Sequence, residues 1–218
     1  MAGNPEITLV HGLWFGSWAM ARLAKKLQAE GFRVRRFSYS TTAGDLRTHA
    51  AQLWEFVRST QADQLHFASH SLGGLVTLGM LHAEAGLPPG RVVLMGSPLD
   101  GSIVARRSRK LPGVKKLLGG MRPTLEHGYE HLPGDRETGM IAGSRAIGLG
   151  MLMGGAGKPG DGTVAVRETL AAGLKDHLVL PVTHTGMLYS AEVARQVAGF
   201  LKSGSFDRTS TCENILFN

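Results

Sequence analysis

Three residues that lie far apart in the sequence, Ser71, Asp161 and His184, are of the types that serine nucleophilic catalysis requires. A free serine hydroxyl is a weak nucleophile, so a base has to accept its proton. The base in turn needs an acid that orients it and stabilises its positive charge, and backbone N–H groups have to bind the developing oxyanion. The sequence offers a candidate for each of these groups.

The nucleophile candidate is Ser71, in the segment Ser69-His70-Ser71-Leu72-Gly73 between a predicted strand and a predicted helix. A serine flanked by small residues in a glycine-x-serine-x-glycine pattern sits on a sharp strand-to-helix turn that exposes its hydroxyl. Ser69 replaces the first glycine here, but serine is also small. The alternative interpretation is a serine that caps the N-terminus of the helix.

The base candidate is His184, one of nine histidines. It follows the last predicted strand and precedes the C-terminal helix, so it can reach the carboxyl edge of the sheet. His11 and His70 belong to turns that they are expected to shape, and the others lie in or beside regular elements or in an insertion. The alternative for His184 is a histidine of a surface loop.

The acid candidate is Asp161, in a glycine-flanked loop between the serine and the histidine. Its rivals are Asp100, which also follows a strand, and Asp135 and Asp176. The alternative for Asp161 is a turn aspartate, or the cap of a helix that starts near Thr163.

Two backbone N–H groups are candidates for binding the oxyanion. One belongs to Leu72, directly after the nucleophile, and the other to Leu13, in the loop HGLWFGSW after the first predicted strand. An ordinary strand-ending turn is the alternative for this loop. Trp14 and Phe15 would form an apolar substrate-binding wall, and residues 151–153 (Met-Leu-Met) a second one, although core packing explains such residues equally well.

The elements that would position these residues alternate between strands and helices. Predicted strands cover 7–10, 32–39, 64–70, 91–97, 138–144 and 177–184, and predicted helices cover 17–30 (with Ser17 as N-cap), 45–60, 72–85 and 186–202. This alternation predicts an α/β fold with a doubly wound, mostly parallel sheet, in which sites lie at the carboxyl ends of the strands.

We expect one domain over residues 1–202, with an insertion over the site at about 100–135. Residues 203–218 are polar and aperiodic, which predicts a flexible or vector-derived tail. The single cysteine, Cys212, lies in this tail and cannot form an internal disulfide.

The chain carries a formal charge of +7, with one basic cluster at 33–36 and another at 106–116. We interpret these clusters as solvated faces, with weak contact to an anionic surface as the alternative. Aromatic residues do not interleave with them, and nucleic-acid motifs are missing, so DNA or RNA binding is not expected. The sequence shows neither a signal peptide nor an apolar run that would span a membrane, so we expect a cytoplasmic protein unless a leader was removed.

Taken together, the motifs HGLWFGSW, SHSLGG, DGTV and HTGML resemble those of the α/β-hydrolase superfamily, in particular its small bacterial lipases and carboxylesterases. The resemblance covers residues 5–202. It implies a cofactor-independent ester hydrolase, with Ser71, His184 and Asp161 as the triad and Leu13 and Leu72 as oxyanion donors. The predicted apolar wall beside the oxyanion loop suggests short- to medium-chain esters as substrates. An acyltransferase or thioesterase would use the same triad, and a non-catalytic binding module on this fold is a third possibility.

Overall fold

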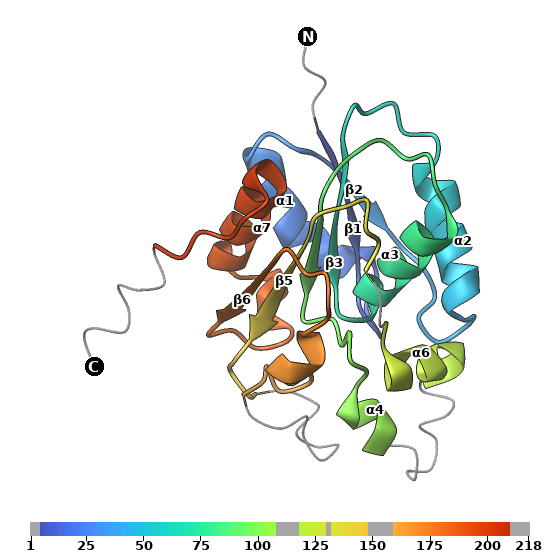
Figure 1. Cartoon of the computed structure of the whole chain (residues 1–218), viewed down its shortest axis with the longest axis vertical. Coiled ribbons are helices and arrows are strands. Elements are labelled where there is room, and N and C mark those ends of the chain that lie inside the picture. Colours follow the sequence, from blue (N-terminus) through green and yellow to red (C-terminus); the bar gives the residue numbers. More distant parts are fainter. Residues whose placement is uncertain (1–4, 108–117, 130–131, 148–158, 210–218) are drawn as a thin grey trace.

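A computed structural model describes residues 5–107, 118–129, 132–147 and 159–209 of the chain. Within them, six strands form one sheet in the order β2-β1-β3-β4-β5-β6, and every neighbouring pair is parallel (Figure 1). The strands are β1 (Glu6–Val10), β2 (Arg33–Phe37), β3 (Leu65–His70), β4 (Val92–Met95), β5 (Thr138–Gly143) and β6 (Asp176–Leu180). The structure confirms the predicted doubly wound parallel sheet.

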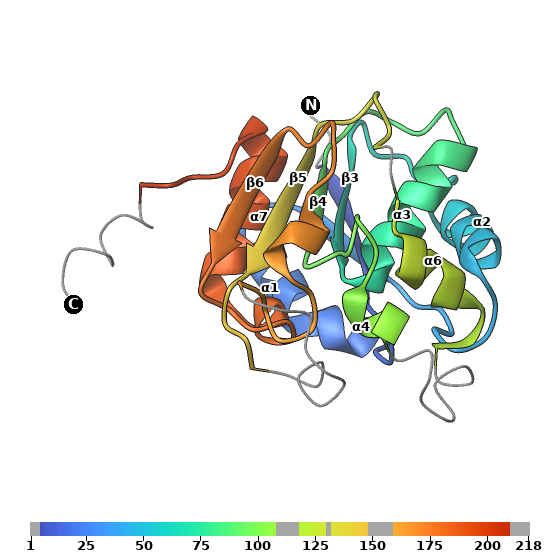
Figure 2. The same cartoon turned by 60° about the horizontal axis from the view of Figure 1, so that its bottom comes forward.

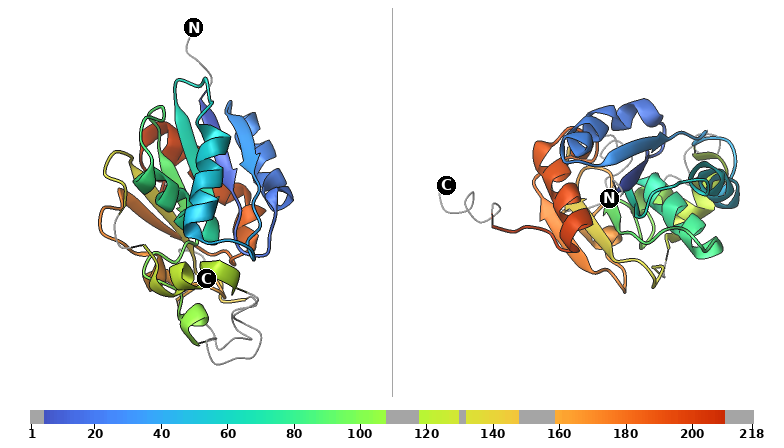
Figure 3. Two further views of the ribbon diagram at one scale, coloured as in Figure 1. Left: turned by 90° about the vertical axis from the view of Figure 1, so that its right-hand side faces the viewer. Right: turned by 90° about the horizontal axis from the view of Figure 1, so that it is seen from above.

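Helices cover both faces of this sheet (Figures 1 and 3). Helices α1 (Ala21–Ala29) and α7 (Ala191–Ser203) pack on one face, and α2 (Leu46–Val57) and α3 (Leu72–Ala83) pack on the other. This placement on alternate faces follows from right-handed crossovers between parallel strands.

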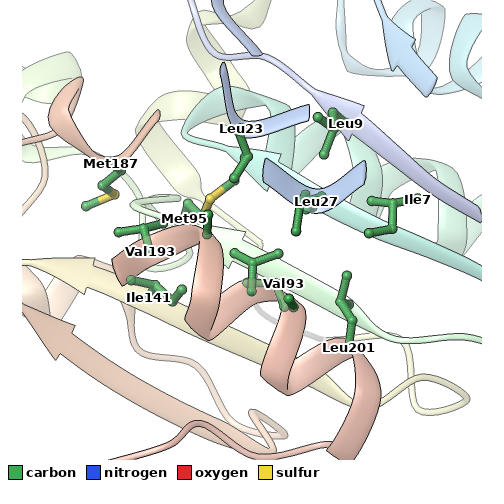
Figure 4. Packing of buried hydrophobic residues seen from close by; sticks show 14 of the residues in the cluster. Ile7, Leu9, Leu23, Leu27, Val93, Met95, Ile141, Met187, Val193 and Leu201 are labelled. Carbon is green, nitrogen blue, oxygen red and sulfur yellow. The ribbon is translucent and has the colours of Figure 1, made fainter. Parts of the chain in front are cut away.

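The central strands are apolar on both faces because each face is covered by helices. In β4, Val93 and Met95 belong to the core beneath α1 and α7, whereas Val92 and Leu94 belong to the core beneath α2 and α3. Figure 4 shows Val93 and Met95 among side chains of α1 and α7, including Leu23 and Val193. The strand period of two residues therefore supplies both cores.

The first basic cluster lies on the edge strand β2 and is largely paired. Arg33 and Arg35 both form ion pairs with Glu6, at 2.6 and 3.3 Å, although Glu6 is only 1% exposed. Arg36 donates a hydrogen bond to the main-chain oxygen of Ser17 over 3.2 Å. These contacts give the cluster a structural role in joining β2 to its neighbours.

The helix predicted at 17–30 begins later than expected. Residues 17–20 form a 3-10 helix, η1 (Ser17–Met20), and Ser17 does not serve as an N-cap, because Gly16 occupies that position. The side chain of Trp18 is 65% exposed and is not part of the core. At 3.6 residues per turn, Trp18 lies on the opposite side of the helix axis from Leu23 and Leu27, so the helical spacing itself directs it away from the apolar face.

The C-terminal elements also differ from the prediction. Strand β6 ends at Leu180 because Pro181 lacks the N–H that would continue the ladder. The predicted helix at 186–202 is divided into the 3-10 helix η6 (Gly186–Leu188) and α7, since the Ser190 hydroxyl accepts a hydrogen bond from Val193 N over 3.2 Å and caps α7. His184 lies between β6 and η6, in a loop as predicted.

The described part of the insertion consists of short helices beyond the carboxyl ends of the strands: α4 (Ile103–Arg107), the 3-10 helix η3 (Gly119–Met121) and α6 (Arg122–His127) (Figure 2). The loop after β5 contains one more 3-10 helix, η5 (Val166–Thr169). Most of the second basic cluster lies outside the described residues. Arg106, which is described, donates a hydrogen bond to the main-chain oxygen of Glu126 over 2.8 Å and so joins α4 to α6.

The beginning of the predicted tail is folded. Phe206 is 5% exposed, and its ring centroid lies 4.8 Å from that of Phe200 on α7. Arg208 pairs with Asp176 of β6 at 2.5 Å. The first residues of the predicted tail thus contact α7 and β6, and Phe206 is the aromatic residue of this polar segment that packs against the core. The helices of the described ranges include none with the length and apolar character needed to cross a membrane.

Candidate active site

Ser71 occupies the turn between β3 and α3 in a strained backbone conformation. Its φ and ψ angles are 54° and −123°, a region that residues other than glycine rarely adopt. Its N–H is held by the carbonyl of Met95 over 2.9 Å. Ser71 stands at the N-cap position of α3, but its side chain makes no capping hydrogen bond. The hydroxyl is thus not used as a helix cap, and strain of this kind, typically about 1–3 kcal/mol, is found most often at functional sites.

The turn closes because two glycines allow α3 to approach neighbouring strands. A Cβ at Gly73 would lie 2.5 Å from the carbonyl oxygen of His11, and one at Gly74 would lie 2.1 Å from Ser97 Oγ. The first contact involves rigid backbone, so a larger residue at 73 would displace the start of α3. These two positions let the N-terminus of α3 lie against the end of β1 and against Ser97, two residues beyond β4.

Ser69, which replaces the first glycine of the pattern, is accommodated by a hydrogen bond. Its hydroxyl lies 2.7 Å from Thr77 Oγ1, which itself donates to the carbonyl of Gly73 over 2.9 Å. Ser69 and Thr77 are both fully buried. Because its hydroxyl has a partner on α3, Ser69 is compatible with the sharp turn.

Asp161 and His184 form a hydrogen-bonded pair. His184 Nδ1 lies 2.7 Å from Asp161 Oδ2, and the other carboxylate oxygen accepts from the backbone N–H groups of Thr163 and Val164 at 2.9 and 2.7 Å. An ionised carboxylate only accepts, so Nδ1 donates and Nε2 is left as the basic nitrogen of His184. The loop thus fixes both the orientation and the tautomer of the imidazole.

The electrostatics of the pair favour an ionised Asp161. Burial opposes ionisation, since Asp161 is 1% exposed, but the neighbouring His184 ring and the two backbone N–H groups outweigh it. The pKa of Asp161 is therefore lowered from its ordinary value. Such a carboxylate can stabilise a protonated imidazole without taking up the proton itself.

None of the three rival aspartates contacts His184. Asp100 and Asp135 are exposed, and Asp176 accepts hydrogen bonds from Phe206 N and Arg208. Asp161 does not cap a helix near Thr163, because the next helix, η5, begins only at Val166. Among the sequence alternatives, geometry favours Asp161.

His70 is the residue whose contribution the sequence did not reveal. Its Nε2 donates to the main-chain carbonyl of His184 over 2.9 Å, and the two rings lie 4.6 Å apart between centroids. The pKa of His70 is lowered to about 3, mainly because the ring is completely buried and to a smaller extent because His184 is nearby. His70 is therefore neutral at neutral pH, and it supports the loop that carries His184.

Leu13 and Leu72 are the two predicted oxyanion donors. Neither of their backbone N–H groups has a protein acceptor among the described residues. The loop with Leu13 is held by the next residue, Trp14, whose N–H donates to Thr41 Oγ1 over 3.0 Å and whose φ is 61°. Gly12 permits this loop to approach, because a Cβ there would lie 3.0 Å from that of Ser71. Free N–H groups next to a nucleophile are suited to bind a negatively charged oxygen.

A cavity of about 340 Å³ joins these groups. Its walls include Ser71, His184, Leu13, Trp14 and Phe15, and its remaining lining is largely apolar: Pro98, Val104, Ala105, Leu118, Leu125, Ile147 and Val164, with His70, Ser102, Thr163 and Thr185.

Within the described contacts, Ser71 Oγ forms no hydrogen bond with the His184 ring. In hydrolases such a bond often tightens only when substrate is bound. Residues 151–153, predicted as a second apolar wall, lie outside the described residues.

Comparisons with known proteins rest on structure alone, because no family model matches the chain and no curated protein matches it. The Bacillus licheniformis lipase BlEst2 in mature form has a TM-score of 0.71 at 18% identity, over 92% of this chain and 91% of that chain. The metagenomic carboxyl esterase MGS0156 has a TM-score of 0.68 at 15% identity, over 84% and 65%. A polyneuridine aldehyde esterase variant has a TM-score of 0.61 at 14% identity, over 91% and 98%.

These likenesses cover almost the whole chain but share few residues with it, so they bear on architecture. They agree with the parallel sheet of this chain and with the helices on both of its faces. The chain therefore has the α/β-hydrolase fold.

Proposed function

We propose that the chain is a serine hydrolase of carboxylic esters, with Ser71 as nucleophile, His184 as base and Asp161 as the orienting acid. The observation that carries this proposal is that one imidazole, hydrogen-bonded to Asp161 at 2.7 Å, shares a cavity wall with a serine in a strained turn. Several neighbours of the same fold are described as a lipase or an esterase, which supports this class of reaction.

The reaction would proceed through an acyl-enzyme. Ser71 Oγ attacks the ester carbonyl while His184 Nε2 accepts its proton, and the N–H groups of Leu13 and Leu72 bind the oxyanion. One such donor is typically worth about 3 kcal/mol in the transition state. The protonated His184 then gives its proton to the departing alcohol, and water, deprotonated by the same nitrogen, releases the carboxylic acid.

The cavity favours an acyl group of short to medium length. The cavity volume of 340 Å³ lies near the lower end of the range of about 300–1,000 Å³ that small-molecule sites occupy. The lining of Leu, Val, Phe and Pro side chains favours an unbranched or compact apolar chain over a polar one. We infer esters with short- to medium-length acyl chains as the preferred substrates.

The proposal is tested with p-nitrophenyl acetate, butyrate, octanoate and palmitate, assayed with the parent and with Ser71→Ala. We expect a maximum at butyrate or octanoate and a loss on the order of 10⁶ in kcat for the variant. Acyl-CoA substrates and added alcohols are assayed in parallel, and a clear preference for either would instead indicate a thioesterase or an acyltransferase. Hydrolysis that survives Ser71→Ala at parental rates would refute the proposed mechanism.

A further inference from the structure

Glu168, on η5, is a buried carboxylate that the proposed reaction does not use. It is 1% exposed, and its side chain accepts hydrogen bonds from two backbone N–H groups, those of Ala165 at 2.6 Å and of Ile103. A buried carboxylate is unfavourable unless such donors surround it. Burial raises the pKa of Glu168, while these two N–H groups and the nearby cations Arg106 and Arg167 act in the opposite direction.

The two donors belong to two different segments that line the cavity. Ile103 is the first residue of α4, and the next two residues, Val104 and Ala105, line the cavity. Ala165 directly follows Val164, which lines the cavity from the loop that carries Asp161. The side chains of Val104 and Ala165 also form a small hydrophobic cluster of their own. One carboxylate thus joins the insertion to the loop of the acid.

Glu168 itself is held in place by the sheet. The hydroxyl of the next residue, Thr169, contacts His177 Nε2 on β6 at 2.9 Å and donates to the carbonyl of Val166 over 2.6 Å. The main-chain oxygen of Glu168 accepts from Asp100 N over 3.0 Å, so both its backbone and its side chain hold residues 100–103. Glu168 is therefore held in one place, and its hydrogen bonds position the start of α4.

We propose that Glu168 is a positioning residue that sets the separation between the α4 wall and the Val164 wall of the cavity, and thereby selects acyl-chain length. The inference rests on the proposed ester hydrolysis and adds a determinant of its specificity. Glu168 touches neither Ser71 nor His184 in the described contacts, so its loss should change binding of the acyl chain rather than the chemical step.

The test compares Glu168→Gln with the parent. A glutamine keeps the length of the side chain, but its –NH2 group cannot accept a hydrogen bond from one of the two backbone N–H groups. That hydrogen bond is lost, and the two segments that Glu168 joins move apart. We expect the ratio of kcat/KM for octanoate over acetate to change by about tenfold, the range associated with small changes in an apolar pocket. The change should appear in KM for octanoate, while kcat for acetate and labelling of Ser71 by a fluorophosphonate remain within about twofold.

Two further variants make the result unambiguous. Glu168→Asp keeps both acceptor oxygens on a shorter side chain, so its selectivity should lie between those of the parent and of Glu168→Gln. It also serves if the glutamine variant does not fold. Glu55→Gln, at an exposed glutamate on α2, is the control and should leave the ratio unchanged.

Equal losses for all chain lengths in both Glu168 variants, or an unchanged ratio, would overturn the inference. Absence of ester hydrolysis and of Ser71 labelling in the parent would instead overturn the proposed function on which it rests.

Discussion

His184 is attached to Asp161 twice, once through its ring and once through its backbone. The ring hydrogen bond spans 2.7 Å, and His184 N donates to the main-chain oxygen of Asp161 over 3.0 Å. The backbone bond holds the two loops together whatever the chemical state of the side chains. The side-chain bond can therefore be altered without separating the loops, which makes its contribution to activity measurable.

Asp161→Asn should lower kcat by about 10⁴ with little loss of stability. The amide oxygen can still accept from Thr163 N and Val164 N, but the amide group no longer fixes the His184 tautomer or stabilises the imidazolium. The measurement is kcat on p-nitrophenyl butyrate with circular dichroism as a check of folding. Asp100→Asn, at the exposed rival aspartate, is the control. A comparable loss in the Asp100 variant would show that the acid has been assigned wrongly.

Ser69→Ala should destabilise the protein by about 1 kcal/mol, since it removes a buried hydroxyl–hydroxyl hydrogen bond. Thr77 keeps its bond to the carbonyl of Gly73, which limits the loss. The free energy of unfolding in urea measures the effect. Activity should persist, because Ser69 supports the turn and does not reach the cavity lining. Stability equal to that of the parent would mean that the Ser69–Thr77 contact is not formed in solution.

Gly73→Ala should destabilise by about 1–3 kcal/mol or more, because the new methyl group meets two backbone carbonyls at 2.5 and 2.6 Å. Gly199→Ala is the matched control. Gly199 lies inside α7, where a Cβ meets nothing within 4 Å, so alanine should stabilise by up to about 1 kcal/mol. Thermal unfolding of the two variants should therefore move in opposite directions. A Gly73 variant as stable as the parent would contradict the close approach of α3 to β1.

Part of the acid sensitivity of the fold should come from His66. Burial, and then Arg91 and Arg136, lower its pKa to about 4 from an ordinary value of 6.5. As the pH falls from 6.5 to about 4, the unfolded chain takes up a proton at this position while the native state does not, so the free energy of unfolding decreases.

In the parent, Arg91 N donates a hydrogen bond to His66 Nδ1 over 2.9 Å. His66→Asn removes the titration of the imidazole and retains an acceptor for Arg91 N. Urea unfolding at pH 7 and pH 4.5 should show a smaller decrease for the variant than for the parent. Parallel curves for the two proteins would contradict the assignment.

The sequence predicted the order of the elements well because the pattern of buried strands is strong. Runs such as 92–95 are apolar at every position, and α2 begins at a residue with clear capping chemistry, Asp45, whose side chain accepts from Thr48 N. The ends of elements were less predictable. Pro181 and Ser190 both had the properties that end β6 and begin α7, but the apolar pattern around them continued and obscured these signals.

The candidate site was predictable where residue type alone limits the choice. A loop histidine before the last helix and an aspartate in a glycine-flanked loop identified the His184–Asp161 pair. The contribution of His70 was not predictable, because its role depends on a carbonyl 114 positions away in the sequence. Glu168 was also missed, since its partner Ile103 lies 65 positions away and a carboxylate in a polar segment resembles a surface residue.

The most direct test of the central claim is covalent labelling. The parent protein is incubated with a fluorophosphonate at neutral pH, digested, and analysed by mass spectrometry to locate the adduct. We predict stoichiometric modification of Ser71 with complete loss of esterase activity, slow modification in Asp161→Asn, and none in Ser71→Ala. An adduct on another serine that accompanies inactivation, or an active parent whose Ser71 remains unlabelled, would contradict the assignment of Ser71 as the nucleophile.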